Sequence, residues 1–87
     1  MPSYLVESYL ADSPGAVDDA RERARRTADL GVGVRYLRTT FLPDDETILH
    51  LFEAPSAEAL DEAGRQAALP FERIVEAVEG SAEPDTS

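Results

Sequence analysis

The sequence predicts a small α+β domain with the element order strand, helix, strand, strand, helix, strand. Aromatic, aliphatic and β-branched residues gather in four short runs, and apolar residues recur at helical spacing in two further stretches. Each of these two stretches begins at a Ser with a Pro beside it. A chain of 87 residues is expected to bury only about 60% of its unfolded surface, so an oligomer is an open possibility.

The first half of the chain reads as one strand and one helix. Residues 4–10 alternate apolar and polar side chains, which is typical of a half-buried strand. A helix is expected to follow, with Ser13 as its N-cap and Pro14 in its first turn. It should end near Leu30, with Gly31 as the C-cap.

The second half predicts a β-hairpin, a helix and a last strand. Residues 32–42 and 46–53 are rich in Val, Tyr, Thr, Phe and Leu, and a Pro-Asp-Asp turn separates them. A second helix is expected between Ser56 and Pro70, because Ser favours the N-cap and Pro blocks further helix. Residues 71–79 form the predicted fourth strand.

This order is the split βαβ arrangement, with four antiparallel strands, two helices on one face, and the first and third strands central. The domain is expected to span residues 3–79. Residues 80–87 contain Gly, Ser, Pro and acidic groups but no large apolar side chain, so we expect an acidic, disordered tail.

One face of the predicted sheet is left uncovered by helices, and alternation along each strand decides which side chains lie on it. Glu7 and His50 are assigned to this open face because a charged or polar group is costly in a core. The residues then expected on the open face are Leu5, Glu7, Tyr9, Tyr36, Arg38, Thr40, Ile48, His50, Phe52, Ile74, Glu76 and Val78. Those expected beneath the helices are Tyr4, Val6, Leu37, Phe41, Leu49, Leu51, Val75 and Ala77. Such an apolar open face predicts a homodimer joined through the sheet.

Composition excludes several classes of protein. The net charge is −10, all eight cations are Arg, and Cys is absent, so disulfides, thiolate nucleophiles and iron–sulfur clusters are excluded. The acidic balance argues against nucleic-acid partners, and no apolar run is long enough for a membrane helix. No haem, flavin or nucleotide signature is present, and we expect a soluble cytoplasmic protein.

The candidate chemistry centres on the single imidazole. On a shared face, His50, Glu7 and Glu76 could bind a divalent first-row metal, perform acid–base work, or form a buried polar network. Arg38 could pair with one of these carboxylates or bind a carboxylate ligand, with Tyr36 and Tyr9 beside it. The residues leave these alternatives open.

The strings SYLVESYL, VRYLRTTFLPDDET and LFEAPSAEALDEAG followed by LPFERIVEAVE resemble a family of small bacterial ferredoxin-like proteins of formerly unknown function, one member of which is nickel-binding. The resemblance implies a ferredoxin-like fold, a homodimer and nickel as the metal. The expected function is therefore that of a small homodimeric metal-binding protein rather than an enzyme. The alternatives are a small-molecule isomerase, cyclase or monooxygenase of the dimeric ferredoxin-like type, and a non-catalytic interaction or regulatory module.

Overall fold

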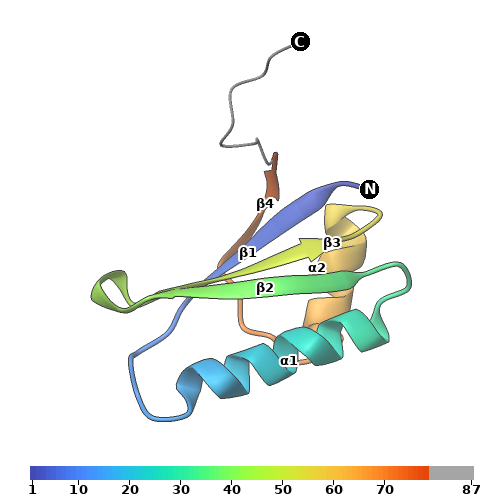
Figure 1. The fold of residues 1–87 in the computed structure, drawn as a ribbon. Coiled ribbons are helices and arrows are strands. Elements are labelled where there is room, and N and C mark those ends of the chain that lie inside the picture. Colours follow the sequence, from blue (N-terminus) through green and yellow to red (C-terminus); the bar gives the residue numbers. More distant parts are fainter. Residues whose placement is uncertain (79–87) are drawn as a thin grey trace.

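The computed structural model describes residues 1–78, and its elements follow the predicted order (Figure 1). The elements are β1 (Ser3–Tyr9), α1 (Ala16–Leu30), β2 (Arg35–Leu42), a short 3-10 turn (Pro43–Asp45), β3 (Thr47–Glu53), α2 (Ala57–Gln66) and β4 (Arg73–Ala77). The sheet is antiparallel with strand order β2-β3-β1-β4, which confirms the ferredoxin-like topology and the central position of β1 and β3. The predicted boundary at residue 79 and the predicted tail 80–87 lie outside the described residues.

Both helices cover the same face of the sheet, and the core lies between them and the strands (Figure 1). Tyr4 and Val6 from β1 pack with Phe52 from β3, Ala24 from α1 and Leu60 from α2. The small alanines on the buried side of α1 let the helix approach the sheet closely. None of the helices in the described part of the chain is long and apolar enough to cross a membrane.

The helix ends agree with the sequence prediction at two points and differ at one. The side chain of Ser56 caps α2 by accepting a hydrogen bond of 3.1 Å from the amide of Ala59. Gly31 closes α1, and its amide donates to the carbonyl of Thr27. The prediction of Ser13 as the N-cap of α1 is wrong, because the cap is Gly15 at φ 78° and no side chain bonds to the first turn.

The C-terminus of α2 is a Schellman turn without the usual glycine. The amide of Leu69 donates to the carbonyl of Gly64 at 2.9 Å, and the amide of Ala68 donates to Arg65 at 3.2 Å. Ala68 occupies the left-handed position of this motif at φ 56°, where a Cβ atom is unfavourable. The chain therefore turns sharply enough for Leu69 to be buried.

The predicted facing of β1 is confirmed, but that of β3 is wrong. Opposite residues of an antiparallel pair share a face, and Val6 lies opposite His50. His50 is only 1% exposed, on the helix-covered face. Ile48 and Phe52, two residues to either side, are buried on the same face. Leu49 and Leu51 lie on the open face, where Leu49 is partly exposed and Leu51 is only 3% exposed. Large apolar groups occupy both phases of β3, so pairing with β1 decides the orientation.

Corrections of the same kind apply to the edge strands β2 and β4. In β2, Tyr36 lies opposite Phe52 and so faces the helices, and a β-bulge follows it, with Leu37 at the irregular position. Beyond the bulge Arg38 and Thr40 face the open side, as predicted. In β4 the phase is reversed as a whole. Ile74 and Glu76 lie opposite the helix-facing Val6 and Tyr4, while Val75 and Ala77 lie opposite the open-face Leu5 and Ser3.

Candidate functional site

The three residues predicted as metal ligands do not come together. Glu7 lies on the open face, whereas His50 is buried on the other side of the sheet. Glu76 shares the helix-side phase of His50, but it lies on β4, separated from β3 by β1. Residues 1–78 contain no group of three or more His, Cys, Asp or Glu side chains that could hold a metal ion. Within this part of one chain, therefore, the donor side chains do not form a metal site of three or more ligands.

His50 instead belongs to a buried hydrogen-bonded network between β2 and β3. Its Nδ1 atom is 2.7 Å from the hydroxyl of Thr39, and that hydroxyl also hydrogen-bonds the phenol of Tyr36. The Tyr36 ring packs against Phe52 with centroids 5.5 Å apart and lies edge-on to the imidazole at 6.4 Å. Because Nδ1 has the Thr39 hydroxyl as a hydrogen-bond partner, burial of the ring is tolerated. This arrangement is the polar network that the sequence left as one of three alternatives.

Burial also fixes the charge state of the imidazole. Removal from water disfavours the protonated ring and lowers the pKa of His50 from 6.5 to about 4. The ring is thus neutral at physiological pH. A neutral imidazole is the form that ligates metals, but a side chain that is 1% exposed offers a metal ion no route to it without local opening.

Glu7 is held by an ion pair on the open face. Its carboxylate accepts a hydrogen bond of 3.0 Å from the Nε atom of Arg73, which lies opposite it on β4. Arg35 and Glu53 form a second such pair, also 3.0 Å, between β2 and β3. Neither arginine is recognisable as a partner from the sequence, because the pattern does not show the phase of β4 or the bulge in β2.

Arg38, Tyr36 and Tyr9, predicted as one ligand-binding group, are separated by the sheet. Arg38 and Tyr9 lie on the open face, and Tyr9 is 73% exposed at the end of β1. Tyr36 lies on the opposite face in the His50 network. Stacking of a single ligand between the two tyrosines is therefore excluded by their placement.

The open face has an apolar centre bordered by charges. Leu5, Leu49, Leu51 and Val75 form the centre, as their register shows. Two Arg–Glu pairs lie toward opposite ends of the strands, and Arg38 lies on β2 beside Leu51. An apolar centre with a polar rim is the usual anatomy of a protein interface.

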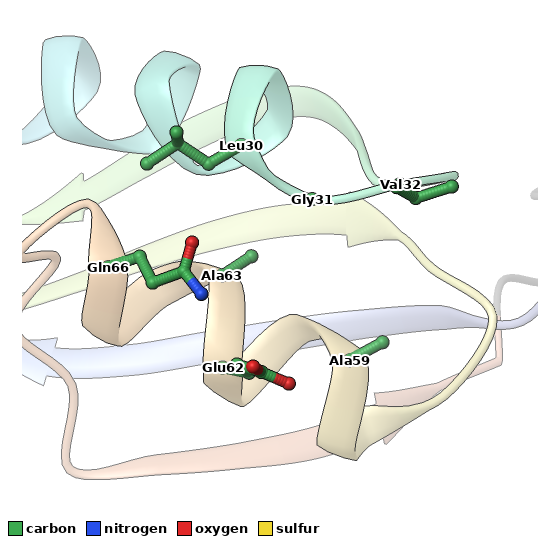
Figure 2. A pocket seen from close by; sticks show the side chains of 7 residues that line it. All are labelled: Leu30, Gly31, Val32, Ala59, Glu62, Ala63 and Gln66. Atoms are coloured by element: carbon green, nitrogen blue, oxygen red, sulfur yellow. The ribbon is translucent and has the colours of Figure 1, made fainter.

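The surface of the described residues has hollows, including the following three. One lies on the open face, has a volume of about 260 Å³, and is lined by Leu5, Arg38, Thr40, Leu49, Leu51, Ala77 and Val78. A second, of about 270 Å³, lies between the end of α1 and α2 (Figure 2). It is lined by Leu30, Gly31 and Val32 and by the α2 residues Ala59, Glu62, Ala63 and Gln66. The third lies beside α2 and the start of β4 and is lined mostly by charged side chains. His50 lines none of these three.

Comparison with known proteins places this arrangement in a family. The sequence profile of the family described as "Nickel responsive protein SCO4226-like" matches residues 4–77, which cover both helices and the four strands except for Ser3 at the start of β1. The chain belongs to this family. Membership confirms the resemblance seen in the sequence and marks the chain as a small metal-related protein.

A solved structure supports the fold of this family member. The crystal structure of SCO4226 from Streptomyces coelicolor A3(2) matches it with a TM-score of 0.73. The alignment covers 91% of this chain and 99% of the other, at 20% sequence identity. At that identity the likeness concerns the fold alone. Among curated proteins, none matches this chain.

Proposed function

We propose that this family member is a small homodimeric metal-binding protein, with nickel as the metal, in which two copies join through the open face of the sheet. The observation that carries the dimer is the apolar centre of that face, Leu5, Leu49, Leu51 and Val75, which no helix of the described chain covers. Leu51 is only 3% exposed in one chain, so the further burial would fall on Leu5, Leu49 and Val75, which are partly exposed. Each contributes less than the roughly 1.5–3 kcal/mol of a side chain buried from full exposure. The support for nickel as the metal is the description of the family.

The charge distribution supports self-association at this face. The whole chain has a net charge of −10, so two copies repel one another over most of their surfaces. On the open face, however, the register places Arg35, Arg38 and Arg73 with only two acids, Glu7 and Glu53. Both acids are already paired with arginines. Two open faces can therefore meet without a strong like-charge penalty.

The dimer also bears on where a metal would bind. One chain assembles no set of three donor side chains within residues 1–78, and His50 lies beneath the helices. A second copy at the open face doubles the carboxylates that face each other there. We therefore propose that nickel is held between copies, with Glu7 as a ligand that exchanges its ion pair with Arg73 for the metal, and that His50 and Glu76 are not ligands.

A nickel titration tests this proposal. Tag-free protein, dialysed against chelator, is melted with NiCl₂ and with MgCl₂ as the control ion. A metal at 100 times its dissociation constant stabilises the folded form by about 2.7 kcal/mol, which gives a clear rise in melting temperature. Glu7→Gln should abolish the rise, whereas His50→Gln should keep it. Glu58→Gln, at an exposed carboxylate of α2, is the matched control.

Each result has a definite meaning for the site. If nickel leaves the melting temperature of the wild type unchanged, the metal part of the proposal is wrong. If His50→Gln loses the nickel effect, the buried imidazole is a ligand after all, and the helices must open to admit the metal. Equal stabilisation of all variants would show binding to dispersed surface carboxylates.

The enzyme alternative has less support from the structure. Its acid–base group would be His50, which lines none of the three hollows and is held by Thr39. The interaction-module alternative uses the same dimer without metal, and the nickel titration separates it from the proposal. We propose a cytoplasmic location for the dimer.

A further inference from the structure

The open face is not flat at its apolar centre. A hollow of about 260 Å³ lies there, with Leu5, Leu49 and Leu51 among its lining residues. Two polar side chains, Arg38 and Thr40, line it from neighbouring same-face positions of β2. Binding sites for small molecules share this plan, with an apolar wall and a few polar groups that fix orientation.

The charge of the hollow is opposite to that of the chain. Among the described residues that line it, Arg38 is the one charged side chain, although the protein as a whole is strongly acidic. A guanidinium beside an apolar wall favours a ligand with a carboxylate at one end and an apolar body at the other. Arg38 also makes an interaction of its own in the structure, and the five N–H donors of a guanidinium suffice for two partners.

We propose that this hollow binds a small organic carboxylate with an apolar body. The carboxylate accepts hydrogen bonds from the guanidinium of Arg38 and the hydroxyl of Thr40, and the apolar body packs on the three leucines. The hollow is formed by one chain, and the inference rests on the proposed homodimer only for the enclosure of the ligand by a second copy. One hollow has a volume of about 260 Å³, slightly below the roughly 300–1,000 Å³ typical of ligand pockets, so a dimer in which the two hollows adjoin would reach that range.

Three probes test the carboxylate contact and the apolar contact of the proposed site separately. Octanoate carries both the carboxylate and the apolar body, acetate carries the charge alone, and octan-1-ol carries the apolar body with a neutral head. Isothermal titration calorimetry of the full chain, below the concentration at which octanoate forms micelles, should rank octanoate first. We expect its affinity to exceed that of either other probe about tenfold or more, since a charge-assisted hydrogen bond is the difference from the alcohol.

Matched variants assign the binding to this hollow. Arg38→Gln should lower the affinity for octanoate about tenfold or more, to the level of octan-1-ol, and leave octan-1-ol binding unchanged. Arg35→Gln is the control, because Arg35 lies on the same strand and face but pairs with Glu53 outside the hollow. Octanoate binding that Arg38→Gln does not weaken, or that matches octan-1-ol binding in the wild type, would overturn the proposal. So would the absence of binding.

Sedimentation of the same samples keeps this proposal distinct from the dimer. A monomer that binds octanoate through Arg38 retains the carboxylate site and refutes the homodimer. A dimer whose octanoate affinity is insensitive to Arg38→Gln retains the homodimer and refutes the carboxylate site.

Discussion

Replacing His50 with Gln should flatten the dependence of stability on pH between about pH 4 and pH 6.5. In the folded protein the pKa of His50 is lowered from 6.5 to about 4 by burial, whereas in the unfolded chain the ring is in water. Between these values the unfolded state binds a proton that the folded state does not. Stability therefore falls as the pH falls through this window and is not reduced by this group above it.

The size of the effect follows from the shift. The lowering of the pKa of His50 from 6.5 to about 4 corresponds to a loss of about 3 kcal/mol in the free energy of unfolding. This loss is complete once the pH has fallen below both values. Between pH 7 and pH 5, about 2 kcal/mol of this should be lost. Glu and Asp side chains add their own dependence, but they are the same in wild type and variant.

The assay is urea unfolding at several pH values between 4.5 and 7, at one protein concentration, with wild type and His50→Gln in parallel. We expect the variant to be less stable at pH 7, because the packing and the Thr39 contact are disturbed. The stability difference should shrink by about 2 kcal/mol on going to pH 5. If it stays constant across the range, His50 is solvated or paired with an acid, and the buried network is wrong. Thr39→Val provides a second variant, which keeps the imidazole but removes the hydroxyl that hydrogen-bonds it.

Three further substitutions test local features by urea unfolding. Ala68→Gly should raise the free energy of unfolding by about 1 kcal/mol, because it relieves the left-handed conformation at φ 56°; a loss would refute the Schellman assignment. Gly31→Ala should lower it by about 1–3 kcal/mol, since a Cβ atom there would lie 2.6 Å from Val34 Cγ2, and a neutral effect would contradict this close packing. Ser56→Ala should cost about 1 kcal/mol through loss of the hydrogen bond to Ala59, whereas Ser56→Asp should retain most of it.

The topology of the sheet could be predicted because local signals agree with it. In β1, Tyr4 and Val6 lie on one face of the strand and Leu5 and Glu7 on the other. Because the one charged side chain lies on the second face, the sequence predicts which face of β1 is turned toward the core. Ser56 marks the start of α2 by direct side-chain chemistry. These features depend on neighbours within a few residues.

The candidate site could not be predicted in the same way because it depends on long-range pairing. The run 47–53 carries large apolar side chains on both of its faces. From the sequence, the polarity of the imidazole is then the one reason to place it on the open side. Thr39 hydrogen-bonds the imidazole from the neighbouring strand, which removes the reason for that assignment. The bulge after Tyr36 likewise changes the phase within β2, and no Gly or Pro in that strand signals it.

Sedimentation equilibrium of the wild type and two variants tests the central claim, a homodimer through the open face, most directly. The wild type should sediment at twice the 9.5 kDa chain mass at micromolar concentration. Leu49→Glu places a charge at the apolar centre and should yield a folded monomer, with folding checked by circular dichroism. Val32→Glu, at a side chain that is 94% exposed in the loop between α1 and β2, should leave the dimer intact. A wild-type monomer, or a dimer that survives Leu49→Glu and dissociates with Val32→Glu, would contradict the claim.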